Sequence, residues 1–370
     1  MASSTSKRVV VKVGTSVLTG GTAHLNRQRM LGLVQQTAAL HAAGHEVVLV
    51  SSGAVAAGRE RLNFPDLSPA LPVKQMLSAV GQSRLMQRYS ELYEIFDLVV
   101  AQVLLTREDL GNRTRFLNAR DTLLTLIDQR IIPIINENDT IATEEIRVGD
   151  NDNLSALVAT LIEADLLIML TDQAGLFTAD PRKHADAKLI ERIDTIDDST
   201  FALAGGTTTG LGTGGMITKL QAARLATRGG VTTIVAAGSP SNSLERIVRG
   251  ESVGTRFEAA AGYVDQRKRH LLIEKTRGKV YVDSGAARKL LSGGASLLPV
   301  GVTRIDDDFK RGMTVAVFAP DGREIAHGLS SYDSADARKL LGAKSSVIQD
   351  ILGYTYGDAL IHRNNMVLLG

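Results

Sequence analysis

The chain of 370 residues contains no cysteine. This absence excludes disulfides, thiol nucleophiles and every zinc or iron–sulfur site that cysteine would hold, and it is typical of a reducing compartment. The seven histidines are scattered, without a pair at metal-binding spacing. The Gly-x-Ser-x-Gly motif of serine hydrolases is also missing. The sequence therefore offers no candidate for a hydrolytic catalytic triad.

Strong charge imbalance and long hydrophobic runs are missing as well. The 42 basic and 40 acidic side chains give a formal net charge of +2, far from the strongly basic composition of dedicated nucleic-acid-binding proteins. The longest aliphatic runs, at residues 131–135 and 166–170, have the length of strands, and a bilayer span needs roughly 20 apolar residues. The first residues lack the composition of a signal peptide. We therefore expect a cytoplasmic protein.

Hydrophobic residues make up 44% of the chain, which is enough for packed cores. Up to about Phe257, short β-branched segments alternate with longer amphipathic ones. We expect strands at residues 9–13, 47–50, 98–105, 131–135, 166–170 and 232–236, and helices at 30–41, 76–95, 154–162 and 216–227. This alternation predicts an α/β fold with an open, mainly parallel sheet sandwiched by helices. Ligands of such sheets bind at the carboxyl ends of the strands.

The composition changes near residue 258. Residues 258–269 are small and charged, as in a linker, and the short alternating segments that follow predict a small, mostly-β domain. We therefore divide the chain into a first domain at residues 1–258, a linker at 259–276, a second domain at 277–355 and a C-terminal tail at 356–370.

The most specific motif is GLGTGGMITK at residues 210–219, which leads into a predicted helix. Four glycines ahead of a helix can present backbone N–H groups to a phosphate, with Lys219 one turn inside the helix. The motif is neither a Walker A sequence, in which lysine directly follows glycine, nor a dinucleotide fingerprint, which follows the first strand. A phosphate-binding loop is our interpretation, and a flexible structural hinge is the alternative.

A second lysine, Lys12, lies near the end of the first predicted strand, before GTS at residues 14–16. A lysine in a buried strand needs a partner for its ammonium group, and the small residues beside it would let a ligand approach the backbone. The alternative is an edge-strand lysine followed by a turn. Ser51 and Ser52 follow the second strand in another small-residue turn that opens a helix, where an anion is favoured.

Amide and carboxylate side chains are dense after the fourth strand, in NEND at residues 136–139 and DNDN at 150–153. Carboxylates hold an ammonium group and amides hold a carboxylate, so this set suits a small zwitterion. We expect one of residues 150–153 to cap the helix predicted from Leu154. A calcium loop beginning at Asp150 is excluded, because Ser155 and Leu161 stand where glycine and glutamate are required.

Thr171 and Asp172 end the fifth strand, where an aspartate suits a metal or ribose contact but is also common in turns. Lysines, a glycine-rich loop and aspartates at the strand ends are suited to phosphoryl transfer. A carboxylate acceptor, with a pKa of about 4.3, is already ionised at pH 7 and needs no general base. Its approach to a phosphate needs cations, which two lysines and Mg²⁺ would supply. These residues predict a kinase with a carboxylate or another anionic acceptor.

Motifs in order along nearly the whole chain resemble the amino acid kinase family, and within it the members that phosphorylate glutamate. The matching segments are VVVKVGTSVLTGG (9–21), VSSGAVAAGRE (50–60), AVGQSRLM (79–86), FLNARDT (116–122), INENDT (135–140), VGDNDNLSA (148–156), LTDQAGLFTADPR (170–182) and GLGTGGMITKLQAA (210–223). The second domain resembles the PUA domain, most clearly in SLLPVGVTRI and FKRGMTVAV. Arg147 stands where lysine is usual in the family and keeps the charge.

The resemblance implies phosphorylation of the γ-carboxylate of L-glutamate by ATP to L-glutamyl 5-phosphate, the first step of proline biosynthesis. Mg²⁺ would be held mainly through the ATP phosphates. The resemblance also implies feedback inhibition by proline and a homodimer or homotetramer. The product, an acyl phosphate with a free amine, can cyclise, which suggests direct transfer to glutamyl-phosphate reductase.

The resemblance also implies roles for individual residues. Lys12 and Lys219 would stabilise the transferring phosphoryl group, with Asp152 orienting both lysines. The glutamate site would consist of Ser52, Asn136, Asp139, Asn151 and Asp152. ATP would be held by Lys12, Thr171, Asp172, Thr213, Gly214, Gly215, Met216, Ile217, Thr218 and Lys219.

Two kinds of alternative remain open. A related kinase, acting on N-acetylglutamate, aspartate or uridylate, would use the same lysines. The acidic-amide cluster favours a free ammonium group, which N-acetylglutamate lacks, and the second domain fits none of these relatives. The other alternative is RNA binding through the PUA-like domain. Residues 270–370 carry 13 basic and 11 acidic side chains, so we expect neither an RNA nor a membrane partner.

Overall fold

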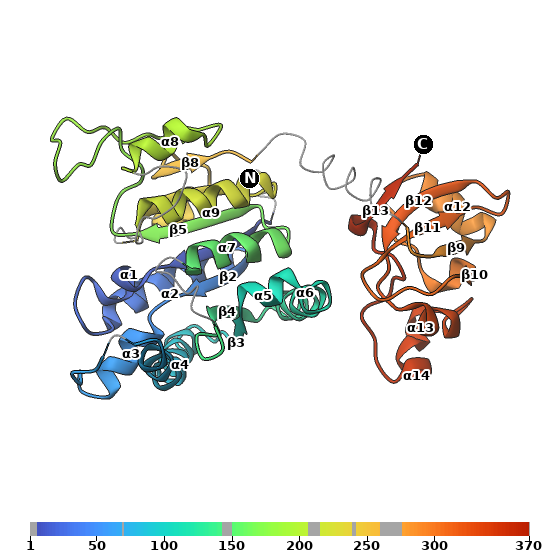
Figure 1. Cartoon of the computed structure of the whole chain (residues 1–370), viewed down its shortest axis with the longest axis horizontal. Coiled ribbons are helices and arrows are strands. Elements are labelled where there is room, and N and C mark those ends of the chain that lie inside the picture. The colour runs from blue at the N-terminus through green and yellow to red at the C-terminus, as the bar shows by residue number, and fades with distance from the viewer. Residues whose placement is uncertain are drawn as a thin grey trace. The chain divides into compact units, whose positions relative to one another are not determined.

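The computed structural model describes residues 6–68, 70–142, 150–205, 215–238, 242–259 and 276–369. The chain divides into two compact units, Met1–Ala261 and Gly262–Gly370, which are coloured from blue to yellow and from orange to red in Figure 1. No helix in the described ranges is long and apolar enough to cross a membrane.

The first unit is built on an eight-stranded sheet in the order β3-β4-β2-β1-β5-β7-β8-β6. The six predicted strands are present, and β1 to β5 and β7 run parallel to one another. The short strand β8 is antiparallel to β7, so the predicted mainly parallel sheet is confirmed. The strand bounds are β1 Arg8–Val13, β2 Glu46–Ser51, β3 Val100–Leu105, β4 Ile132–Glu137, β5 Leu166–Thr171, β6 Arg192–Ile193, β7 Thr232–Ala237 and β8 Thr255–Phe257.

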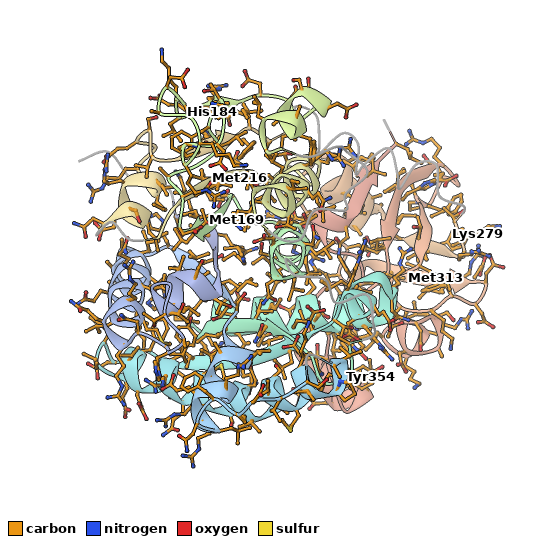
Figure 2. All side chains as sticks on the ribbon, turned by 60° about the vertical axis from the view of Figure 1, so that its left-hand side comes forward. Met169, His184, Met216, Lys279, Met313 and Tyr354 are labelled. Carbon is orange, nitrogen blue, oxygen red and sulfur yellow. The ribbon has the colours of Figure 1, made fainter. Side chains whose placement is uncertain are left out.

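Helices cover both faces of this sheet. The described helices are α1 Thr15–Thr19, α2 Arg27–Ala42, α3 Ala54–Arg61, α4 Leu71–Glu94, α5 Arg107–Gly111, α6 Arg113–Asp128, α7 Asp150–Leu161, α8 Asp198–Leu203, α9 Met216–Arg228 and α10 Ser243–Val248. Along β1, Val9 and Val11 pack with α2, α4 and α10, whereas Val10 packs with α6, α7 and α9. Met169 of β5 is fully buried in the second of these layers (Figure 2). The sheet is therefore sandwiched by helices, as predicted.

Two glycines let α3 and α4 touch through their backbones. A Cβ on Gly81 would lie 1.8 Å from the Ala54 carbonyl oxygen, and one on Gly58 would lie 1.9 Å from the Leu77 carbonyl oxygen. Any side chain at either position would force the helices apart. The glycines thus hold α4 close to α3, which follows β2 directly.

The second unit contains a five-stranded sheet in the order β10-β9-β11-β12-β13, which confirms the predicted small β domain. The elements are β9 Lys279–Val282, α12 Ser284–Leu291, η1 Pro299–Gly301, β10 Val302–Asp306, β11 Thr314–Phe318, β12 Glu324–Leu329, α13 Ser334–Lys339, η2 Ser345–Val347, α14 Ile348–Leu352, η3 Arg363–Asn365 and β13 Met366–Leu368. Strand β13 pairs with β12, so part of the segment at residues 356–370 belongs to this sheet. Lys279 lies on the surface of the unit (Figure 2).

Candidate active site

The carboxyl ends of four parallel strands bring the predicted residues to one edge of the sheet. Lys12 lies in β1, Ser52 follows β2, Asn136 lies in β4 and Thr171 ends β5. Strand β1 pairs with β2 on one side and β5 on the other, so the alternative of an edge-strand lysine is wrong. The strand order β4-β2-β1-β5 sets the order of these side chains along the edge. Neighbouring strands are spaced by about 4.8 Å, which sets the distance from one side chain to the next.

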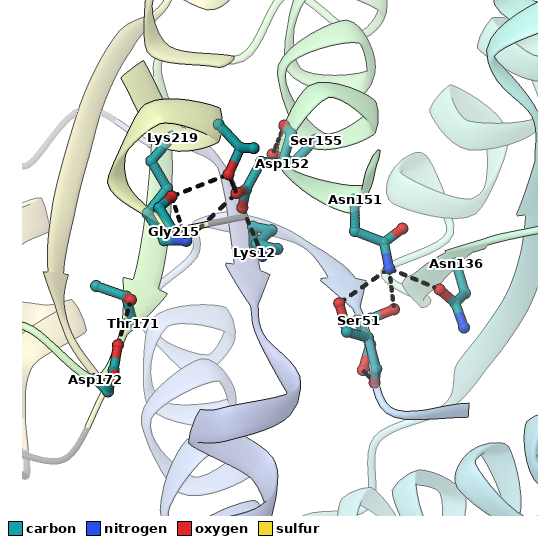
Figure 3. Close-up of polar contacts among 12 residues, drawn as sticks. Lys12, Ser51, Asn136, Asn151, Asp152, Ser155, Thr171, Asp172, Gly215 and Lys219 are labelled. Carbon is teal, nitrogen blue, oxygen red and sulfur yellow. Dashed lines mark hydrogen bonds and ion pairs between the residues drawn. The ribbon is translucent and has the colours of Figure 1, made fainter. Parts of the chain in front are cut away.

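At the centre of the edge, one carboxylate holds two lysines (Figure 3). Lys12 Nζ lies 2.5 Å from Asp152 Oδ1 and Lys219 Nζ lies 3.3 Å from Asp152 Oδ2. Thr218 Oγ1 donates a hydrogen bond of 2.7 Å to the same Oδ2. Asp152 is only 1% exposed, and Lys12 and Lys219 are also buried. The structure thus joins the three residues to which catalytic roles were assigned from sequence.

The electrostatics of the three groups are coupled. Burial alone would raise the pKa of Asp152, but the ammonium groups of Lys12 and Lys219 and two hydrogen bonds hold it below its usual value. Burial lowers the pKa of Lys12, and the Asp152 carboxylate opposes that shift. Two ammonium groups facing one carboxylate leave an excess of one positive charge. A water-poor site with fixed excess positive charge stabilises an anion that forms there.

Local backbone structure places these groups. Helix α7 begins at Asp150, so Asn151 and Asp152 lie in its first turn. The expectation that one of the residues 150–153 precedes the helix as its cap is wrong. Gly215 has a φ of +104° and precedes α9 as its N-cap, which puts Thr218 and Lys219 in the first turn of that helix. A positive φ is readily adopted only by glycine.

Two cavities meet at this cluster. The first, of about 550 Å³, is lined by all the residues predicted for the glutamate site, Ser52, Asn136, Asp139, Asn151 and Asp152, and also by Lys12 and Lys219. The second, of about 810 Å³, contains Thr171, Asp172, Gly215, Met216, Ile217 and Lys219 among its lining residues. Both volumes are in the range of small-molecule sites.

The two cavities share Gly215 and Lys219. Thr218 was predicted with the nucleotide residues, but it lines the first cavity. Thr213 and Gly214 lie outside the described residues. Two molecules, one bound in each cavity, would thus meet beside Lys219.

Amides join β2, β4 and α7 inside the first cavity (Figure 3). Asn151 Nδ2 donates to Ser52 Oγ and Asn136 Oδ1, both at 3.0 Å, and lies 3.4 Å from the Ser51 carbonyl oxygen. Asn136 Nδ2 donates to Gln82 Oε1 at 2.8 Å. Ser78 Oγ donates to Asp139 Oδ2 at 2.5 Å. Burial raises the pKa of Asp139, and the hydrogen bond from Ser78 opposes that rise.

Sequence reasoning did not identify four residues around the first cavity. Gln82 and Ser78 of α4 support its polar residues from behind, and Arg59 of α3 and Lys74 of α4 line it directly. One signal was available: Ser78 and Gln82 stand four residues apart on the buried face of α4, with Leu77 and Leu85. Polar residues on the buried face of an amphipathic helix indicate a specific partner.

Comparisons with known proteins agree with this geometry. The model of the amino acid kinase family matches residues 7–237, and that of the PUA domain matches residues 278–352. A protein named Glutamate 5-kinase from Sodalis glossinidius is 52% identical over 363 residues, 98% of this chain and 99% of that protein. A protein of the same name from Herpetosiphon aurantiacus is 53% identical over 361 residues, which are 97% of this chain and 98% of that protein.

Among solved structures, carbamate kinase from Giardia lamblia bound to AMP-PNP has a TM-score of 0.51 at 20% identity. The match covers 70% of this chain and 100% of that one. This likeness supports the fold of the first unit.

Proposed function

The chain belongs to the amino acid kinase family, and we propose that it transfers the γ-phosphoryl group of ATP to the γ-carboxylate of L-glutamate. The products are ADP and L-glutamyl 5-phosphate, the first intermediate of proline biosynthesis. The observation that carries this proposal is the meeting of two cavities at Lys219, beside Lys12 and Asp152. The full-length similarity to proteins named Glutamate 5-kinase supports glutamate as the acceptor.

In this proposal ATP occupies the second cavity, with Thr171 and Asp172 on one side and the start of α9 on the other. A γ-carboxylate oxygen of glutamate attacks the γ-phosphorus from the first cavity, and the bond from that phosphorus to the bridging oxygen of ADP breaks. The carboxylate is already ionised, so no proton has to be removed. Lys12 and Lys219 stabilise the charge on the transferring group, and Asp152 keeps both ammonium groups in place.

The family implies that Mg²⁺ accompanies ATP. Within the described ranges, the side chains of His, Asp and Glu form no cluster of three that could hold a metal ion. Asp152 already faces two ammonium groups. This donor set fits an ion bound mainly by phosphate oxygens and water, as Mg²⁺ is in many kinases. Bound in that way, Mg²⁺ neutralises phosphate charge.

The first cavity can hold both ends of glutamate. Its γ-carboxylate would lie toward Lys12 and Lys219, and its ammonium group toward Asp139 and the amides of Asn136 and Asn151. Strand β4 lies two strands from β1, about 10 Å away, a distance that fits a five-carbon dicarboxylate and its hydrogen bonds. The α-carboxylate then requires a cation of its own.

Arg59 and Lys74 are the cations that we assign to the α-carboxylate. Both line the first cavity, and neither has an ion-pair partner among the described residues. Arg59→Gln and Lys74→Gln should each raise KM for glutamate by about tenfold, the effect of one lost charge-assisted hydrogen bond, with kcat nearly unchanged. Inhibition by 4-aminobutyrate, which lacks the α-carboxylate, should not change. Arg61→Gln, an exposed arginine of the same helix, is the control. Equal KM values in all variants would refute the assignment.

The raised pKa of Asp139 predicts a pH dependence. Only the ionised carboxylate attracts the ammonium group, so KM for glutamate should rise on acidification at a higher pH than an ordinary aspartate would produce. Ser78→Ala removes the hydrogen bond that opposes the shift. The rise in KM should therefore begin at a still higher pH in this variant.

The control for Ser78→Ala is Ser83→Ala, at an exposed serine of the same helix. Protonation of glutamate itself is common to both variants and cancels in their comparison. The same pH profile in both would show that Asp139 does not bind the ammonium group.

The direct test of the proposed function is ADP release from MgATP, with the acyl phosphate trapped by hydroxylamine. L-Glutamate, L-aspartate and N-acetyl-L-glutamate are compared as acceptors. The proposal predicts hydroxamate from glutamate alone, and less of it when proline is added. Hydroxamate from aspartate or N-acetylglutamate only would keep the kinase chemistry and overturn the acceptor assignment.

The remaining partners belong to the same proposal. Proline would compete for the site of the ammonium and α-carboxylate groups, and the enzyme would act as a cytoplasmic homodimer or homotetramer. The cyclising product favours direct transfer to glutamyl-phosphate reductase. If the added reductase captures no more product than free diffusion allows, this contact is refuted.

A further inference from the structure

A loop of the first unit, residues 171–178, forms one wall of the second cavity. Its lining residues are Thr171, Asp172, Gln173, Leu176, Phe177 and Thr178. The lysines and the arginine that line the same cavity, Arg182, Lys183 and Lys219, lie outside this loop. A wall with one carboxylate and no cation repels phosphate, whereas it can accept hydrogen bonds from sugar hydroxyls and pack against a base. The loop therefore suits the nucleoside part of ATP, with the phosphates toward Lys219, where the two cavities meet.

The loop is held from behind by Thr255, the first residue of β8. Thr255 Oγ1 accepts a hydrogen bond of 2.8 Å from the Leu176 N–H and lies 3.5 Å from the Leu176 carbonyl oxygen. Thr255 is fully buried, and Leu176 is only 2% exposed. Thr255 stands behind Leu176, outside the lining of the cavity. It can therefore influence a bound nucleotide only through the loop.

The backbone of the loop touches Thr255 closely. A Cβ on Gly175 would lie 2.6 Å from Thr255 Oγ1 and 2.9 Å from the Thr255 nitrogen, so only glycine permits this approach. The Leu176 N–H is a buried donor, and the loss of its acceptor would be unfavourable. A methyl group in place of the hydroxyl would also stand too close to the Leu176 nitrogen, because carbon contacts require about 3.5–4.0 Å. Gly175 and Leu176 would therefore have to move if the hydroxyl were lost.

We propose that Thr255 is a positioning residue that fixes the loop at residues 171–178 and thereby sets the affinity for the nucleoside part of ATP. This inference rests on the proposed function and goes beyond it, because it adds a residue outside the cavity and assigns the loop to one part of the nucleotide. Strand β8 pairs with β7, so Thr255 ties the loop to the sheet. The first cavity and Lys12 take no part in this contact.

The test compares variants of the full-length protein. Thr255→Val removes the hydroxyl at nearly constant volume, whereas Thr255→Ser keeps it. Thr233→Val makes the same chemical change at a fully buried threonine of β7, whose hydroxyl lies 3.4 Å from the Val231 carbonyl oxygen, and serves as the control. KM is measured for MgATP and for L-glutamate. Inhibition constants in competition with MgATP are measured for ADP and for tripolyphosphate, which lacks the nucleoside.

For Thr255→Val we expect about a tenfold rise in KM for MgATP and in the inhibition constant of ADP, as for the loss of one hydrogen bond. KM for glutamate, kcat and the inhibition constant of tripolyphosphate should stay within about twofold, which is less than half of such an effect. Thr255→Ser and Thr233→Val should keep all constants within the same limit. Melting curves establish that each variant is folded. Thr255→Ala, which removes the hydroxyl without crowding Leu176, replaces Thr255→Val if the latter does not fold.

Equal rises in the constants of ADP and tripolyphosphate, or of MgATP and glutamate, would reduce Thr255 to a structural role and overturn the inference. Unchanged constants in Thr255→Val would overturn it as well, and so would a Thr255→Ser variant that binds ADP as weakly as Thr255→Val. These outcomes differ from failure of the proposed function, which would appear as the absence of glutamate-dependent ADP release by the unmodified protein.

Discussion

Lys219→Ala is expected to lower kcat by a factor of about 10²–10³, the effect of removing one preorganised group that stabilises charge in a transition state. Lys219 lines both cavities and lies in the first turn of α9, 3.3 Å from Asp152. Its ammonium group is therefore placed where the phosphoryl group would pass. KM for glutamate should change much less, because the amides and Asp139 remain in place.

The control for this variant is Lys188→Ala, an exposed lysine of the same unit that lines neither cavity. It should retain the kcat of the unmodified protein. Steady-state kinetics with saturating MgATP compare the two. A kcat for Lys219→Ala close to that of the control would mean that the phosphoryl group does not pass beside α9.

Asp152→Ala is expected to abolish measurable turnover and to lower the free energy of unfolding by about 3–5 kcal/mol, as for a buried ion pair that loses one partner. The change leaves two buried ammonium groups, Lys12 and Lys219, without the carboxylate between them. Asp186→Ala, at an exposed aspartate, should have little effect on either quantity. Urea unfolding monitored by circular dichroism measures the difference.

The stability effect of Asp152→Ala has a predictable pH dependence. The pKa of Asp152 is lowered in the folded protein, so its carboxylate stabilises the fold above the pKa of the unfolded chain. That contribution is lost as the pH falls through the folded-state pKa. The difference between the two proteins should therefore be full near neutral pH and vanish in strong acid. A constant difference across this range would show that the loss of the carboxylate charge is not its cause.

The fold and the centre of the site were predictable because local patterns encode them. Buried β-branched strands and amphipathic helices define a parallel sheet, and parallel strands place their carboxyl ends together. Lys12, Asn136 and Thr171 could therefore be assigned to one edge of the sheet from the sequence alone. Strands β6 and β8 comprise two and three residues, which is too short for a recognisable alternation.

The residues of α4 that support the first cavity from behind could not be found in the same way. Gln82 precedes its partner Asn136 by 54 residues, and their contact depends on how closely α4 approaches the sheet. That approach depends on backbone contact at Gly58 and Gly81, which a single sequence does not reveal. The capping expectation at residues 150–153 was wrong for a related reason. Asp152 turns toward Lys12 and Lys219, and these tertiary contacts outweigh its local preference for a helix cap.

The central claim is that a carboxylate oxygen in the first cavity attacks the phosphorus of ATP in the second. It is tested most directly with L-glutamate carrying ¹⁸O in both γ-carboxylate oxygens, MgATP and hydroxylamine, with the released phosphate analysed by mass spectrometry. Hydroxylamine attacks the acyl carbon, so the oxygen that joined carbon to phosphorus leaves with the phosphate. The account predicts one ¹⁸O atom in each phosphate released. Phosphate without ¹⁸O, formed at the rate of ADP release, would contradict it.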